Sequence, residues 1–186
     1  MITIGEWVNP TRAVGLIAYG TAAVCCCIAW VRAKTQRRDW QVAALLTLIE
    51  SALLLDMAFN GRWRLHQFLL DTAQRAHEYQ FRRLPQVIVL IILAGLLLWG
   101  LLRIRRLSRG KSGSSLAASG VLLSIVLWCT EVVSLHQVDH VMYHRFGKIM
   151  AVSLLWILAC LMTSIGILFV SHLDKPHAGS KSDRTM

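Results

Sequence analysis

Long apolar blocks separated by short polar segments dominate the pattern of this chain. Five blocks approach or reach the roughly 20 residues that a helix needs to cross a bilayer. They cover residues 13–31, 40–59, 87–102, 116–135 and 149–170. The third block is short, but Gln86 and Arg103 can reach the two interfaces on either side of it. The pattern therefore predicts an all-α, polytopic membrane helical bundle of about five transmembrane helices.

The segments between the blocks are too short for a separate soluble domain. We expect one helical-bundle domain over residues 1–173, in which Gly147 and Lys148 begin the fifth span, and a flexible polar cytoplasmic tail over 174–186. The longest connection, residues 61–85, spaces its apolar residues at helical intervals. It predicts an amphipathic helix at the interface between spans two and three, or an extension of the second span.

Composition and charge support a membrane location. The chain is 55% hydrophobic, with a mean hydropathy of +0.53 and a net charge of +10. Because the basic residues flank the apolar blocks, they indicate topology and not binding of nucleic acid. Alternate connections hold 12 and 8 of the 20 Lys and Arg residues. By the positive-inside rule, the N-terminus lies outside and the C-terminus is cytoplasmic, and we expect a bacterial inner (plasma) membrane.

The densest polar chemistry follows the fourth block. On a helix, His136, Asp139 and His140 fall at i, i+3 and i+4, and therefore share one face, with His144 beside it. Two histidines one turn apart, with a carboxylate between them, can offer several ligands to one ion. With Glu131 as a further donor, the spacing predicts a site for a transition metal such as zinc, copper or iron.

Two acids lie inside the second apolar block. Glu50 is near its middle and Asp56 is nearer its outer end. An ionised group at such depth costs at least about 2.5–3.5 kcal/mol on insertion scales, so a partner or a function is expected. We interpret the two acids as candidates for proton or ion handling. The alternative for Glu50 is a protonated carboxyl group that is hydrogen-bonded to a neighbouring helix. In either case we expect Glu50 and Glu131 to face the bundle interior.

The connection 61–85 is rich in basic residues. One interpretation is that its arginines contact lipid phosphates at the membrane surface. The other is that they line a pocket for an anionic group. The residues in question are Arg62, Arg75, Tyr79, Arg82 and Arg83.

The topology gathers these groups at one end of the bundle, because spans two and four both run from inside to outside. Three functions fit this arrangement. The first is metal binding in a redox or membrane-oxidoreductase setting. The second is a non-catalytic accessory or assembly subunit of a larger membrane complex or a homo-oligomer, and the third is a small proton or cation transporter. Haem, with His66 and His136 as axial ligands, is less favoured because the chain has no attachment motif.

The basic-residue asymmetry predicts that Lys111 and His144 lie on opposite sides of the membrane. Cysteines introduced at these two positions should react with a membrane-impermeant thiol reagent from opposite sides of sealed vesicles. Labelling of both from one side would contradict the predicted order of spans, and with it the grouping of spans two and four.

Overall fold

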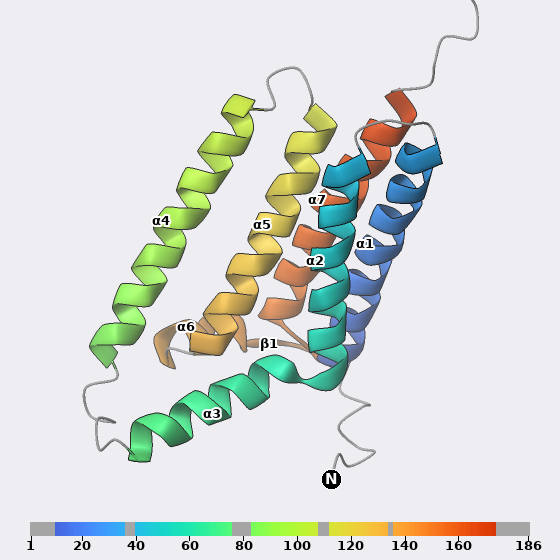
Figure 1. Ribbon diagram of the computed structural model, residues 1–186. Coiled ribbons are helices and arrows are strands. Elements are labelled where there is room, and N and C mark those ends of the chain that lie inside the picture. The colour runs from blue at the N-terminus through green and yellow to red at the C-terminus, as the bar shows by residue number, and fades with distance from the viewer. Residues whose placement is uncertain (1–9, 36–39, 76–82, 108–111, 134–135, 174–186) are drawn as a thin grey trace, which may run out of the picture.

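The computed structural model describes residues 10–35, 40–75, 83–107, 112–133 and 136–173, and these parts are almost wholly helical (Figure 1). Five of the helices are long and apolar enough to cross a membrane. They are α1 (Pro10–Thr35), α2 (Trp40–Phe59), α4 (Arg83–Leu107), α5 (Ser112–Val133) and α7 (Ala151–Leu173). The prediction of an all-α bundle with five spans is confirmed, and the chain is an integral membrane protein.

Four of the spans form the body of the bundle. Helix α7 packs against α5 and α1, and α1 also packs against α2, so the interior lies among these four helices. Helix α4 packs chiefly against α5 and stands apart at the edge of the bundle (Figure 1). None of its most apolar stretch is buried inside the protein, as expected for a helix that faces lipid.

Glycines on α5 and α7 allow the backbones of these two helices to approach each other closely. A Cβ atom built at Gly120 would lie 2.6 Å from the Ala159 carbonyl oxygen and 2.5 Å from Thr163 Oγ1. Gly166 of α7 likewise has no room for a side chain against the backbone at Ala117 of α5. Small residues let membrane helices approach closely, because dispersion contacts replace the hydrophobic effect between them.

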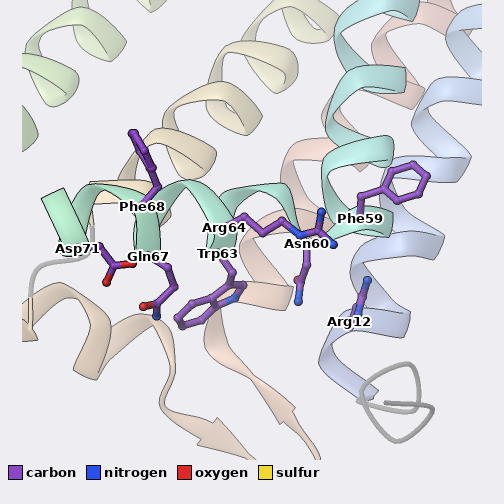
Figure 2. A pocket seen from close by; sticks show the side chains of 8 residues that line it. All are labelled: Arg12, Phe59, Asn60, Trp63, Arg64, Gln67, Phe68 and Asp71. Atoms are coloured by element: carbon purple, nitrogen blue, oxygen red, sulfur yellow. The ribbon is translucent and has the colours of Figure 1, made fainter. Parts of the chain in front are cut away.

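The polar end of the bundle is the end that carries α3, α6 (His136–Met142) and a short hairpin after α6, at the C-terminal ends of α2 and α5. Helix α3 (Gly61–Arg75) starts directly after Asn60, whose φ of 60° is left-handed, and it crosses this end of the bundle (Figure 1). The backbone break at Asn60 separates α3 from α2, so α3 is a helix of its own and not an extension of the second span. A cavity of about 460 Å³ lies beside α3 (Figure 2).

The connection after α6 (His136–Met142) corrects one prediction. We expected Gly147 and Lys148 to begin the fifth span, but they form the turn of a small antiparallel hairpin of β1 (Arg145–Phe146) and β2 (Ile149–Met150). Gly147 has a φ of 66°, which suits a tight turn and which residues with a Cβ rarely adopt. Helix α7 therefore begins only at Ala151.

The close packing of α5 and α7 predicts that Gly120→Val destabilises the protein. Forcing a branched side chain against the α7 backbone should lower the free energy of unfolding by about 1–3 kcal/mol. Gly95→Val on α4 is the matched control, because nothing lies within 4 Å of a Cβ at that position. Thermal unfolding in detergent micelles checks both variants, and equal melting temperatures would contradict the packing.

Candidate functional site

The candidate site begins where α2 passes into α3. After Asn60, the chain turns so that the first turn of α3 lies against Asp56. A Cβ at Gly61 would lie 2.5 Å from Asp56 Oδ1, so this position needs a glycine. The Asp56 carboxylate thus lies at the N-terminal end of α3, where the free N–H groups and the helix dipole stabilise negative charge.

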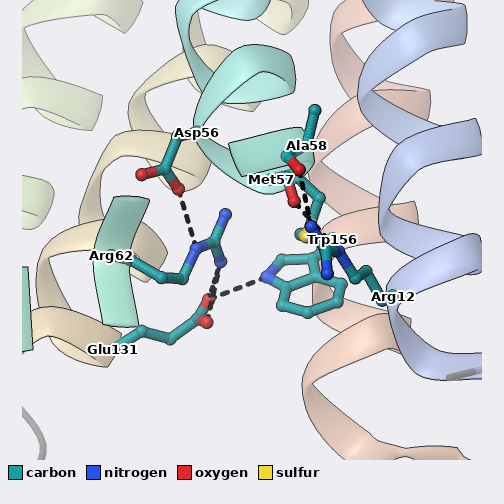
Figure 3. A network of polar contacts seen from close by, with 7 residues as sticks. All are labelled: Arg12, Asp56, Met57, Ala58, Arg62, Glu131 and Trp156. Atoms are coloured by element: carbon teal, nitrogen blue, oxygen red, sulfur yellow. Dashed lines mark hydrogen bonds and ion pairs between the residues drawn. The ribbon is translucent and has the colours of Figure 1, made fainter. Parts of the chain in front are cut away.

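Arg62 connects α3 to both α2 and α5 (Figure 3). Its Nε donates to Asp56 Oδ2 at 2.8 Å, and its Nη1 donates to the two oxygens of Glu131 at 2.8 and 2.7 Å. The Arg62 and Glu131 side chains are only 5% and 3% exposed. A buried arginine needs such partners, because an unpaired charge there would be strongly destabilising.

Trp156 extends this cluster to α7. Its indole Nε1 donates to Glu131 Oε1 at 2.9 Å, and its ring lies 5.3 Å from the guanidinium carbon of Arg62 (Figure 3). Trp156 is buried, so its N–H must find an acceptor inside the protein. We call Asp56, Arg62, Glu131 and Trp156 the ion cluster.

The ion cluster carries two acids and one base. Burial lowers the pKa of Arg62, but Glu131, Tyr19 and Asp56 together raise it above the ordinary value of an arginine, so Arg62 stays charged. If both acids are ionised, the ion cluster keeps one unbalanced negative charge. A proton or another cation can balance it.

Arg12 of α1 fixes the end of α2 beside the ion cluster. Its Nε and Nη2 donate to the carbonyl oxygens of Met57 and Ala58 at 3.3 and 2.5 Å (Figure 3). These carbonyl groups belong to the last turn of α2, where the helix has no further N–H groups to donate to them. Arg12 therefore holds α1 and α2 together at the polar end.

Tyr19 of α1 connects the ion cluster to the centre of the bundle. Its side chain is fully buried, its ring centroid lies 6.5 Å from that of Trp156, and its hydroxyl has no hydrogen-bond partner within the described part of the chain. It interacts electrostatically with Arg62 and Glu131 of the ion cluster and with Glu50.

Glu50 lies near the middle of α2, six residues or about 9 Å along the helix from Asp56. It is 0% exposed, and neither carboxyl oxygen has a hydrogen-bond partner among the described residues. The nearby Thr163 hydroxyl donates to the carbonyl oxygen of Ala159 at 3.1 Å. Because the Thr163 hydrogen is used there, it is not available to Glu50, and an ionised Glu50 carboxylate in this position would lack both solvent and a donor.

The expected interior placement of both glutamates is confirmed, since Glu50 is fully buried and Glu131 is 6% exposed. Asp56, the second candidate for proton handling, belongs to the ion cluster with Arg62. Sequence reasoning missed Tyr19, Arg12 and Trp156 as parts of this region. A signal for Tyr19 existed, because it follows Gly15 by one helical turn on the small-residue face of α1.

The histidines of the predicted metal site lie on and after α6. Among the described residues, no three His, Cys, Asp or Glu side chains come together as a metal would require. Asp139 is half-buried, His140 and His144 are exposed, and the His144 ring contacts Phe146 with centroids 5.2 Å apart. The side chain of His136 lies outside the described residues, so the metal site stays a prediction.

Four of the five expected anion-binding residues have side chains outside the described part of the structure, so this site stays a prediction. Arg62 is buried in the ion cluster. Arg75 ends α3 and Arg83 begins α4, but their side chains lie outside the described residues, as do Tyr79 and Arg82 altogether. His66, considered for haem, has Nδ1 3.1 Å from the Val132 carbonyl oxygen and so joins α3 to α5.

No model of a known protein family matches this chain, and searches of curated proteins and of solved structures find no match. The site is therefore interpreted from its own geometry and chemistry.

The ion cluster predicts unequal effects of two neighbouring arginine substitutions. Arg62→Gln leaves Glu131 buried and without its cation, and should lower the free energy of unfolding by about 3–5 kcal/mol. Arg64→Gln, an exposed neighbour on the same helix, should change it by less than about 0.5 kcal/mol. Equilibrium unfolding in mixed micelles measures both, and similar values for the two variants would contradict a stabilising role of the ion cluster.

Proposed function

We propose that the protein is a proton transporter in which Glu50 takes up and releases the proton at the centre of the membrane. The observation that carries this proposal is the complete burial of Glu50 with no hydrogen-bond partner for either oxygen among the described residues. A carboxylate that stayed ionised there would cost free energy, because it is buried without a partner. A carboxyl group that alternates between its protonated and ionised forms can carry a proton.

The polar groups of the bundle provide a route from the polar end to Glu50. Asp56 is 13% exposed and is the most accessible acid of the ion cluster. Glu131 follows, and Tyr19, which interacts electrostatically with both Glu131 and Glu50 and whose hydroxyl can donate and accept, is the proposed relay between them.

The opposite half of the bundle contains no buried acid or base among the described residues, although the Ser119 and Ser164 hydroxyls are buried there. Its hydrophobic cluster consists of Cys26, Ala29, Ala43, Leu46, Ala117, Val121 and Ile167. In this conformation Glu50 exchanges protons with the polar end. Transfer to the other side requires the helices around this apolar cluster to separate, which makes one conformational change part of the proposed cycle.

A proton suits Glu50 better than a metal cation does. Cations such as Ca²⁺ take about six to eight oxygen ligands, and Mg²⁺ requires near-ideal octahedral geometry. Among the described residues, the groups that interact with Glu50 include the Thr163 hydroxyl, the Tyr19 hydroxyl and the thiols of Cys26 and Cys160. This set can pass a proton but offers too few oxygens to a hard cation.

Metal binding at α6 is kept as a second proposal. It is supported by the helical conformation of His136–Met142, which puts His136 and His140 one turn apart. Glu131 is left out of the ligand set, because Arg62 and Trp156 engage its oxygens. Stoichiometric zinc, copper or iron in purified protein, lost in His140→Ala, would support this proposal, whereas wild-type protein without metal would refute it.

The proton-transport proposal predicts that Glu50→Gln abolishes proton flux while the protein stays folded, because the amide keeps the shape of the side chain but does not titrate. Flux is measured in proteoliposomes with an enclosed pH-sensitive dye, under a membrane potential imposed by potassium and valinomycin. Wild-type protein should let protons move in response to this potential, which the dye reports as a change of the enclosed pH. The variant should give the same signal as protein-free liposomes.

Asp183→Asn in the C-terminal tail is the control, because it removes a carboxyl group outside the predicted spans. It should transport at the wild-type rate. The proposal would be contradicted if the Glu50 variant transported protons at the wild-type rate, or if the wild type gave no flux above protein-free liposomes. Either result would favour the accessory-subunit interpretation.

A further inference from the structure

The cavity beside α3 lies at the surface of the polar end and is separate from the buried ion cluster. It has a volume of about 460 Å³ and is formed mainly by α3, with Arg12 of α1 and Phe59 of α2 (Figure 2). Polar side chains and the aromatic rings of Phe59, Trp63 and Phe68 alternate along its wall, which gives the cavity an amphipathic character.

One end of the cavity is positively charged and carries amide donors. Arg64 extends from α3 toward Asn60 and the side of Arg12 (Figure 2). Arg64 is exposed, and its guanidinium makes no ion pair within the described part of the chain. A phosphate placed here would meet a guanidinium fork and the Asn60 side-chain amide, which are both good donors to phosphate oxygens.

The far end of the cavity has the opposite charge. Asp71 lies two helical turns beyond Arg64, with Gln67 between them (Figure 2). A carboxylate at this distance leaves room for a single phosphate near Arg64 and disfavours a second one. The cavity is therefore suited to a small headgroup with one phosphate.

The apolar part of the wall continues into the surface of α2. Phe59 is 58% exposed and lies at the end of a stripe of exposed side chains at helical spacing, with Leu55, Leu48 and Leu45. Trp63, 47% exposed, lies between the two ends of the cavity and is held by stacking on Tyr143 at 6.3 Å. Aromatic side chains of this kind are typical of the level of lipid headgroups.

We infer that this cavity binds the headgroup of one membrane phospholipid. Its phosphate lies against Arg64 and Asn60, its glycerol region lies against Trp63, and one acyl chain follows the stripe on α2 from Phe59 to Leu45. The same phosphate chemistry would also bind free phosphate. The apolar stripe that leaves the cavity at Phe59 favours the lipid, since free phosphate has nothing to place on it. This inference does not depend on proton transport.

Native mass spectrometry of the full chain, released from nanodiscs that contain phosphatidylglycerol, tests this site. One phospholipid should stay bound to the wild type. The ratio of lipid-bound to lipid-free protein should fall about tenfold in Arg64→Gln, as expected for loss of one charge-assisted hydrogen-bonded contact. Arg64→Lys should recover part of it, because the positive charge returns.

Arg145→Gln is the matched control, since it removes an exposed arginine at the same end of the bundle but outside the cavity. It should retain lipid as the wild type does. Diacylglycerol with the same acyl chains should not be retained, and excess inorganic phosphate should not displace the phospholipid. Equal retention in Arg64→Gln and Arg145→Gln, retention of diacylglycerol, or full displacement by phosphate would overturn the inference.

Discussion

Burial of the Arg62–Glu131 ion pair is the constraint on which the polar end depends. The pair lies inside an apolar bundle, where neither charge is tolerated without the other. To reach Glu131 on α5, Arg62 must enter from α3, and α3 can bring it there only because the chain breaks at Asn60 and Gly61 leaves room for Asp56. Trp156 then fixes Glu131 from α7. One ion pair thereby joins α2, α3, α5 and α7.

This arrangement divides the membrane interior into two halves. The polar half contains the ion cluster, Tyr19 and Glu50, and it has Arg12 as a cap on α2. The other half contains small and aliphatic side chains packed at close range. A buried carboxyl group at the boundary between such halves can hold a proton. The apolar half prevents protons from leaking through, and the polar half allows the carboxyl group to exchange its proton with that end of the bundle. The proposed function follows from this asymmetry.

The fold was largely predictable from the sequence, whereas the site was predictable only in part. Block length and helical periodicity predicted the five spans and a helix within the connection 61–85, of which the structure shows α3 over Gly61–Arg75. The cost of buried charge placed Glu50 and Glu131 inside. The partner of Glu131 was not predictable, because Arg62 is 69 residues away and several arginines in the same connection were equal candidates. Tyr19 has no local signal of function beyond its place among small residues. The hairpin at Gly147 was missed because its strands are only two residues long.

The protonation state of Glu50 tests the account most directly. Infrared difference spectra between the wild type and Glu50→Gln separate a protonated carboxyl group from an ionised carboxylate, because the two have different C–O stretching bands. The spectra are recorded in detergent at about pH 7, which is far above the usual pKa of about 4.3 for a glutamate in water. The account predicts that the wild type contains a protonated carboxyl band that is absent from the variant. Carboxylate bands in its place would contradict the assignment of Glu50 as the resting proton carrier.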